Sequence, residues 1–414
     1  MSDVTADWRA TVATPRYRTA WGLGTLPHLG YWIVILTFQG IIATQTDADP
    51  LVLGLFYFTT LVPFLLVSLP AGAWADRFNR QHLLAASHFV ILLVSASVSV
   101  LILTRHATAL TFMVGGFVFG TAMAISQPAG HSLIAESVPR HLMLTAVTLH
   151  GFGVTLSRFV GPALAALAIS AVGAGLTMLA HCVLCLSIVL LALTMGPPQK
   201  RHSGMPATAG RSAIKGGLAH ANARWPVSVS LLAVAVVSLF GASYLSQMAS
   251  LAALVTGSST WFAVLMSATG LGALGGVALA AIPLPARWDM RRLCASLLCL
   301  GVCLGALGWV RGQIPQLALV LAVAAFQFST ITLSLRLIQG SIADSHRGRV
   351  MSINQLCYAG LIPVGGLLLG ATWSWVGPSW AFSAMGVFVA GSAVVIMHRF
   401  WSLDPRFPLE RRAT

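Results

Sequence analysis

The sequence predicts an all-α polytopic membrane protein, and three features support this fold class. First, 57% of the 414 residues are hydrophobic and only 8% are charged, whereas soluble domains carry about 25% charged residues. Second, the hydrophobic residues form runs of about 20 or more, the length that a helix needs to cross a bilayer. Third, the Lys and Arg residues lie mainly in every second loop between these runs. Because backbone groups in lipid must bond within their own segment, such runs should be helical.

Twelve runs of this kind predict twelve transmembrane helices. In chain order they cover residues 20–43, 51–75, 83–104, 109–134, 143–171, 174–196, 227–252, 260–283, 291–310, 316–342, 350–373 and 379–399. The alternation of apolar and polar residues that is typical of a membrane β-barrel is absent from these runs. The first run follows a polar stretch without a small-residue cleavage site, so we expect no removable signal peptide.

The placement of positive charge predicts the orientation. Twenty of the 24 Lys and Arg residues lie before the first run, in or at the edges of the even-to-odd loops, or at or after the end of the last run, and only Arg105 and Arg311 lie in the opposite loops. Because cytoplasmic loops carry the excess of positive charge, both termini should be cytoplasmic. The formal net charge of +14 is then a sign of topology, and we expect no nucleic-acid partner. The expected location is the inner membrane of the cell, crossed many times.

The longest non-apolar segment divides the chain into two groups of six runs. We therefore predict two pseudo-symmetric six-helix bundles, joined by a cytoplasmic linker that either contains a short interfacial helix or is disordered. The predicted parts are a cytoplasmic N-terminal tail (1–19), an N-terminal bundle (20–196), the linker (197–226), a C-terminal bundle (227–399) and a cytoplasmic C-terminal tail (400–414).

The two halves repeat each other. Residues 134–143 match residues 342–351 without gaps, and residues 160–173 match residues 364–377. The two offsets, 208 and 204 residues, are both close to half the length of the chain. Six runs per half with the same orientation predict parallel repeats, related by an axis along the membrane normal. In such transporters the substrate binds near the midplane between the halves.

The loop between the second and third runs gathers charge in an otherwise apolar region. It reads GAWADRFNR, with the spacing Gly72-x-x-x-Asp76-Arg77-x-x-Arg80. This spacing resembles the signature cytoplasmic loop of the major facilitator superfamily. The family pattern usually has glycine where Asn79 stands and a basic residue where Gln81 stands. Asn tolerates a left-handed backbone better than most residues, so Asn79 is a mild departure from the pattern.

Other motifs are similar to one branch of that superfamily, the enterobactin-exporter-like branch. They are Leu29-Gly30-Tyr31-Trp32, Gln127-Pro128-Ala129, Gly161-Pro162 and Arg347-Gly348-Arg349-Val350-Met351-Ser352. The branch contains siderophore exporters as well as drug and macrolide efflux proteins. The resemblance therefore implies export of a small molecule by alternating access, with proton antiport. Gly161-Pro162 is also similar to the end of an antiporter signature, and its alternative role is ordinary helix packing.

The resemblance further implies that the charged loop is a gate. In such a gate Asp76 faces the N-terminal end of the helix that starts near Val350, and Arg77 and Arg80 pair with Glu136. The repeat supplies an equivalent set, Asp344, Arg347, Gly348 and Arg349. These contacts would hold the cytoplasmic ends of the halves together while the cavity faces outward. The alternative is a solvated positive loop, whose exposed ion pairs contribute only about 0–1 kcal/mol each.

Ionisable residues within the spans are few. None of the ten carboxylates lies in the middle of a run, so the buried acid that carries the proton in many proton-coupled relatives is missing. Arg158 and Arg336 lie within spans, where a charge normally faces a cavity or a partner. They either attract an anionic or oxygen-rich substrate or bond helix carbonyls. His28 and His150 are the candidate proton carriers, because imidazole titrates near neutral pH, and the alternative role of each is hydrogen-bonded packing.

Further polar and aromatic residues are candidates for lining a substrate cavity, although each has packing as its alternative role. They are Tyr31, Gln39, Gln127, Tyr244, Gln247, Gln327, Asn354 and Tyr358. The six cysteines all lie in apolar runs, where cysteine behaves as a small hydrophobic residue. His181, Cys182 and Cys185 have a spacing that metal sites use, but no second cluster lies nearby. We expect neither a metal nor a cofactor.

The function that these observations predict is a secondary active exporter of a small organic molecule. A siderophore is the first candidate for the cargo, and the alternative is a broad range of drugs or macrolides. The expected partners are the substrate, protons and the bilayer, and we expect a monomer. HExxH, GxSxG and P-loop motifs are absent, so an intramembrane enzyme or direct ATP hydrolysis is not expected. A membrane sensor is a third class, which we disfavour because we find no soluble output domain.

Overall fold

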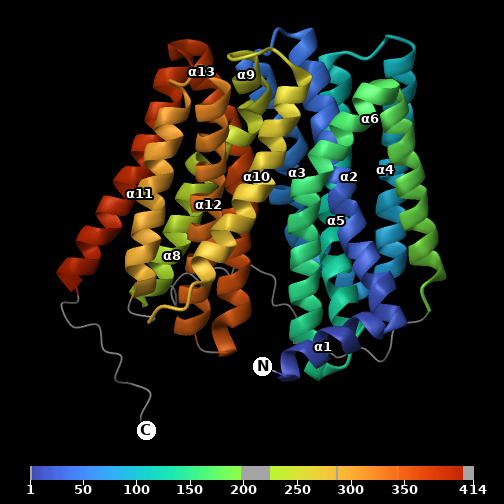
Figure 1. The fold of residues 1–414 in the computed structure, drawn as a ribbon. Helices are drawn as coiled ribbons and strands as arrows, with labels where there is room; N and C mark the ends of the chain where they lie inside the picture. Colours follow the sequence, from blue (N-terminus) through green and yellow to red (C-terminus); the bar gives the residue numbers. More distant parts are fainter. Residues whose placement is uncertain (1, 197–223, 286–287, 343, 404–414) are drawn as a thin grey trace. The chain divides into compact units, whose positions relative to one another are not determined.

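The computed structural model describes residues 2–196, 224–285, 288–342 and 344–403 (Figure 1). Within these ranges every regular element is a helix, which confirms the all-α prediction. Among the residues that the structure describes, ten helical segments are long and apolar enough to cross a membrane. The number of twelve spans remains a prediction, since two of the ten segments each cover two of the predicted spans.

Seven predicted spans coincide with single helices to within a few residues. These are α2 (Pro15–Gln45), α3 (Pro50–Arg77), α4 (Arg80–Leu103), α5 (Ala109–Glu136), α10 (Ser259–Ala281), α11 (Asp289–Leu307) and α12 (Gln313–Ser341). Local polar groups fix some of the boundaries. At the start of α5, the Thr108 side chain accepts a hydrogen bond from the backbone N–H of Thr111, and the Thr111 side chain accepts one from the Thr108 backbone. This reciprocal cap satisfies two backbone donors that the helix itself leaves free.

Two longer helices each contain one residue with non-helical backbone. Helix α6 (Met143–Thr194), which follows the short 3-10 helix η1 (Arg140–Leu142), is broken at Gly173, and α13 (Asp344–Leu403) is broken at Gly377. Their φ angles are 82° and 80°, values that glycine adopts without the penalty that a Cβ brings. The breaks fall between the predicted spans 143–171 and 174–196, and between 350–373 and 379–399.

The predicted span 227–252 is a helix of changing pitch. It consists of α8 (Trp225–Val236), the π-helical turn η2 (Val237–Gly241), the 3-10 segment η3 (Ser243–Gln247) and α9 (Met248–Ala253). Close packing accompanies this irregularity, because a Cβ on Gly365 would lie 1.8 Å from the carbonyl oxygen of Leu239. Such π-turns and 3-10 turns in a helix often lie at functional sites or hinges.

The N-terminal segment predicted as a polar tail is largely helical. Helix α1 (Ser2–Ala13) lies across the end of α2 in Figure 1 and packs against α2, η1 and α6. Thr11 is fully buried, and its hydroxyl donates a hydrogen bond to the carbonyl of Asp7 at 2.7 Å. The low hydropathy of this segment hid its helical character, since α1 is not a span.

The chain forms two compact units. Unit 1 consists of Met1–Ala48, Thr59–Ala209 and Ser259–Gly270, and unit 2 of Asp49–Phe58, Gly210–Ser258 and Leu271–Thr414. Helices α3 and α10 are thus divided between the units. The predicted bundles, 20–196 and 227–399, differ from the units in these two helices and remain predictions. The linker lies outside the described residues as far as residue 223, as does the C-terminal tail from residue 404.

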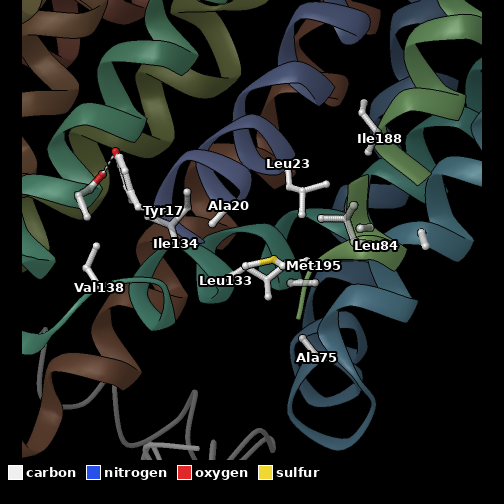
Figure 2. Packing of buried hydrophobic residues seen from close by; sticks show 14 of the residues in the cluster. Tyr17, Ala20, Leu23, Ala75, Leu84, Leu133, Ile134, Val138, Ile188 and Met195 are labelled. Carbon is white, nitrogen blue, oxygen red and sulfur yellow. Dashed lines mark hydrogen bonds between the residues drawn. The ribbon is translucent and has the colours of Figure 1, made fainter. Parts of the chain in front are cut away.

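Unit 1 is built around α2, α4, α5 and α6, and one end of it is filled by an apolar cluster (Figure 2). Leu23, Leu84 and Ile134 from three different helices are each at most 1% exposed there. The hydroxyl of Tyr17 donates a hydrogen bond to the Ala146 carbonyl at 3.1 Å, which ties α2 to α6 (Figure 2). In unit 2, α8, α12 and α13 bury a smaller cluster that includes Val227, Ile338 and Val350.

Candidate functional site

A small cavity lies among the helices of unit 1. Its volume is about 10 Å³, room for about one water molecule. It is lined by Leu23, Gly24, Pro27, His28, Leu84, Ser126, Gln127, Gly130, His131 and His150. Leu23 and Leu84 also belong to the apolar cluster of Figure 2, so the cavity borders that cluster. Two predicted proton carriers and one predicted cavity residue, Gln127, therefore lie together.

Three helices each contribute one histidine to this cavity. His28 lies on α2, His131 on α5 and His150 on α6. The centroids of the His131 and His150 rings are 5.3 Å apart, and those of His28 and His150 are 6.2 Å apart. His131 was not among the predicted site residues, because a single histidine in an apolar run gives no sign of neighbours on other helices.

Glycine makes room for the central imidazole. A Cβ on Gly24 of α2 would lie only 2.7 Å from Cε1 of His150. The backbone carbonyl of Gly24 also accepts a hydrogen bond from Nδ1 of His28, at 2.9 Å. His150 is 4% exposed, His28 is half-buried and His131 is exposed.

Arg158 lies on α6, two turns beyond His150. Its guanidinium carbon is 5.1 Å from the centroid of the Trp32 ring, a cation–π distance. Gly161 packs against the same tryptophan, since a Cβ there would lie 2.8 Å from Cβ of Trp32. The neighbouring Tyr31 ring stacks on Phe119 with a centroid distance of 6.0 Å. The cation in this span is thus held against an aromatic residue of α2.

Side-chain contacts hold the charged loop where α4 begins. Arg80 pairs with Glu136 at the end of α5, and its Nε donates to the Ala75 carbonyl at 3.1 Å. Asn79 has φ −66° and ψ 118°, and its side chain accepts a hydrogen bond from the backbone of Gln81 at 2.9 Å. Asn79 is therefore an N-cap with ordinary extended backbone, and the tolerance of Asn for a left-handed backbone is not used at this position.

Gln81, the second departure from the signature pattern, also has a structural role. Its side-chain amide donates to the carbonyl of Gly196 at 2.9 Å, which links the start of α4 to the chain just beyond the end of α6. Arg77 is exposed, and a Cβ on Gly72 would meet nothing within 4 Å. The side chains of Asp76, Asp344, Arg347 and Arg349, and the environment of Gly348, lie outside what the structure describes.

Arg336, the second cation within a span, is held at the end of a helix. Its guanidinium donates to the Ala280 carbonyl at 2.8 Å and lies 3.4 Å from a carboxylate oxygen of Asp289. Arg292 contacts the other carboxylate oxygen at 3.4 Å and donates to the carbonyls of Ala280 and Ile282. These two arginines cap the C-terminal end of α10, which favours cations. These contacts fit the second of the two roles considered for Arg336, in which it bonds helix carbonyls.

The remaining cavity candidates are spread over both units. Gln39, Tyr244, Gln247 and Gln327 are each at most 2% exposed, and Asn354 and Tyr358 are half-buried. Gln247 donates to the Pro50 carbonyl at 3.0 Å within unit 2. The structure does not bring these residues into the His28 cavity, and their role in substrate binding remains a prediction.

The His-Cys spacing in α6 does not form a metal site among the described residues. Nδ1 of His181 lies 2.9 Å from the hydroxyl of Ser95, and the Cys185 thiol lies 3.7 Å from Nε2 of the same ring. No group of three or more His, Cys, Asp or Glu side chains with metal-binding geometry occurs in the part of the chain that the structure describes. These residues are packed against α4 in the core of unit 1.

Comparisons with known proteins agree with this architecture. Residues 7–405 match a protein family described as transmembrane secretion effector. The chain is 27% identical over 397 residues to the staphyloferrin A transporter of Staphylococcus aureus (strain NCTC 8325 / PS 47), and the alignment covers 93% of this chain and 95% of that protein.

Solved structures show a likeness of fold alone. One is a bacterial homologue of the human lysosomal transporter Spinster in an inward-facing and occupied conformation, with a TM-score of 0.69, 16% identity, and coverage of 95% of this chain and 97% of that chain. Another is a D-xylose–proton symporter, with a TM-score of 0.69, 14% identity, and coverage of 92% and 96%.

Proposed function

The chain belongs to the transmembrane secretion effector family, within the major facilitator superfamily of multi-pass membrane transporters, and from this premise we propose that it exports a siderophore across the inner membrane. Transport proceeds by alternating access of twelve helices arranged as two repeats, with both termini in the cytoplasm. Protons move in the opposite direction and drive the export.

One observation carries the choice of cargo. The similarity to the staphyloferrin A transporter extends over 93% of this chain and 95% of that protein, so it rests on nearly the entire chain rather than on a single motif. The fold alone would not favour a siderophore, because the same fold occurs in a D-xylose–proton symporter. The sequence similarity therefore carries the proposal, and the fold supplies the mechanism.

The charges within unit 1 fit a polar cargo and a coupled proton. Arg158 is half-buried and positively charged, and it lies against Trp32. We expect it to attract the anionic or oxygen-rich groups of the substrate. The coupling ion is then bound by histidine, because the spans contain no carboxylate in their middle. On this basis Arg158→Gln should weaken binding of an anionic siderophore more than binding of a neutral competitor.

The loop around Asp76 is the proposed cytoplasmic gate. At the start of α4, the loop is held by the ion pair of Arg80 with Glu136 and by the Asn79 cap. In the outward-facing state, Asp76 would bond the N-terminal end of α13, which begins at Asp344 and not near Val350 as the sequence predicted. Residues Asp344 to Arg349 would form the equivalent contacts of the second repeat.

The proposal is tested by following siderophore in cells that lack the protein. Under iron limitation, the deletion strain should retain siderophore inside the cell, and an uncoupler should cause the same retention in cells that contain the protein. Inverted membrane vesicles supplied with staphyloferrin A should accumulate it when they are acidified inside. Competition of drugs or macrolides with staphyloferrin A in these vesicles tests the alternative function, export of a broad range of drugs.

Two results would contradict the proposal in different ways. If drugs compete fully and the deletion strain releases siderophore normally, the protein is a drug exporter. If siderophore release and drug sensitivity are both unchanged by the deletion, neither cargo is correct. Accumulation that resists an uncoupler would refute proton antiport while leaving the cargo intact.

A further inference from the structure

The three histidines of the unit 1 cavity form one cluster of contacting rings. Three separate helices supply them, and the His150 ring has its neighbours His28 and His131 at centroid distances of 6.2 and 5.3 Å. Both neighbouring rings meet it edge to face, at interplanar angles of 73° and 78°. The backbone is adapted to this arrangement, because any side chain at position 24 would displace the His150 ring.

The hydrogen bonds leave nitrogen lone pairs available at the cavity. Because the Gly24 carbonyl accepts a bond from Nδ1 of His28, the neutral ring carries its proton on Nδ1 and its lone pair on Nε2. Nδ1 of His150 is buried and has no hydrogen-bond partner among the residues that the structure describes. A buried polar atom without a partner is costly, so this nitrogen is suited to bind something small and polar.

The charges around the cluster limit what it can bind. The groups that act on His28 electrostatically are His131, Arg158 and, from α4, His88. Helices α2, α4, α5 and α6 of unit 1 contain one carboxylate, Glu136 at the last position of α5. That carboxylate is paired with Arg80. Two imidazolium rings at these separations would repel each other, and Arg158 would add to the repulsion. The cluster therefore holds one additional positive charge at a time.

The most exposed ring of the cluster is that of His131. His131 is exposed on the surface of unit 1, whereas His150 is buried. A proton that reaches His131 can pass to the His150 lone pair with a small rotation of either ring or through one water molecule in the cavity. His28 lines the same cavity, as does Leu23 of the apolar cluster (Figure 2).

We propose that His28, His131 and His150 form a single proton-binding site, which carries the one proton exchanged per transport cycle. A hydronium ion transfers its proton to an imidazole lone pair through His131, an N–H bond forms and water is left behind. Release reverses the step when the transporter has changed the side from which His131 is accessible. This inference rests on the proposed proton antiport and assigns its proton carrier.

Histidine titration tests the site without any substrate. In full-length protein labelled with ¹³C and ¹⁵N at histidine and held in lipid nanodiscs, the three rings should titrate as a coupled group as the pH is lowered from about 8 to about 3. His150→Gln should shift the midpoints of His28 and His131. His181→Gln is the matched control, because His181 is equally buried on α6 but bonds to Ser95, and it should leave the three midpoints unchanged. Three independent midpoints, or the absence of titration in this range, would overturn the proposal.

Transport separates the failure of this site from the failure of the proposed function. In proteoliposomes supplied with staphyloferrin A, His150→Gln should lower proton-driven flux about tenfold or more, while exchange of labelled substrate at equal concentrations stays within about twofold. His28→Gln should act in the same direction and serves if His150→Gln does not fold. Proton-driven flux that survives both substitutions would refute the site. If unaltered protein does not move staphyloferrin A, the cargo is wrong, and the titration still decides the site.

Discussion

At the scale of single residues, glycine positions large rings in unit 1. A Cβ at several glycines of α2 and α6 would come within 2.8 Å of a ring or its Cβ on the other helix. The pairs are Gly24 with His150, Gly30 with His181, Gly153 with Trp21 and Gly161 with Trp32. Each helix thus receives rings of the other in gaps that only glycine leaves open. The two helices consequently approach closely where the cavity lies.

This packing predicts an unequal response of two glycines on the same helix. Gly161→Ala should lower the unfolding free energy by about 1–3 kcal/mol, because the new methyl group would overlap Trp32. Gly151 is exposed, and a Cβ there would meet nothing within 4 Å. Gly151→Ala should therefore be neutral or stabilising by up to about 1 kcal/mol through helix propensity. Thermal unfolding in detergent measures both, and equal melting temperatures for the two variants would contradict the packing account.

At the scale of elements, the sequence repeat has a structural counterpart. Gly173 in α6 and Gly377 in α13 are 204 residues apart and have φ of 82° and 80° with ψ of 163° and 169°. This region of backbone space is essentially restricted to glycine. The matched stretches 160–173 and 364–377 end on these two glycines, and the shared conformation indicates that both halves use the same break between consecutive helical segments.

Substitution of the glycine at either break should therefore lower the unfolding free energy by a similar amount. Gly173→Ala and Gly377→Ala should each cost about 1–3 kcal/mol, because alanine cannot adopt this backbone without strain. Gly391→Ala in α13 is the control, since that glycine is exposed, has no neighbour within 4 Å of a Cβ and does not have positive φ. Melting temperature and yield of monodisperse protein report the effect. A normal melting temperature for Gly173→Ala would show that the break is not required.

The end of α10 is a second element whose stability depends on a few charges. Asp289 is 4% exposed and accepts contacts from both Arg292 and Arg336. Asp289→Asn should lower the unfolding free energy by about 1–3 kcal/mol, because two guanidinium groups lose their shared counter-charge. Asp47→Asn is a suitable control, since Asp47 is exposed and has φ 49°, a conformation that Asn also tolerates. A similar melting temperature for both variants would argue against the cap.

At the scale of the whole molecule, span positions were predictable and side-chain partners were not. A run of apolar residues is a local property, so α2 to α5 and α10 to α12 agree with the predicted ranges. The cavity depends on three helices that are distant in sequence, so His28 and His150 were chosen as single residues while His131 was missed. Likewise the spacing of Arg336 gave no sign of Asp289, 47 positions earlier. Asn79 was noted for its tolerance of a left-handed backbone, but it serves as a helix N-cap, because both positions favour the same residue type.

The charge distribution makes a prediction about topology. Because most Lys and Arg residues lie on one predicted side, both termini should be cytoplasmic. Green fluorescent protein fused after residue 403 should fluoresce, and alkaline phosphatase fused at the same position should be inactive. Phosphatase fused within the loop that contains Arg105 should be active and serves as the control. An active phosphatase at the C-terminal position would invert the orientation and would place the Asp76 loop on the opposite side.

The gating proposal predicts how one charge affects the entire transport cycle. Asp76→Asn should remove an attraction between a carboxylate and a helix N-terminus worth about 0.5–2 kcal/mol, and so shift the ratio of outward to inward states by about two- to thirtyfold toward the inward state. Accessibility of a single introduced cysteine to a membrane-impermeant maleimide, added from each side, measures this ratio. Asp47→Asn retains the gate and should leave the ratio unchanged. Because the gate acts on the equilibrium between states and not on substrate contacts, Asp76→Asn should slow proton-driven flux while substrate affinity measured in either single state is preserved. A ratio and a flux both equal to those of the unaltered protein would mean that the loop is only a solvated stretch of positive charge.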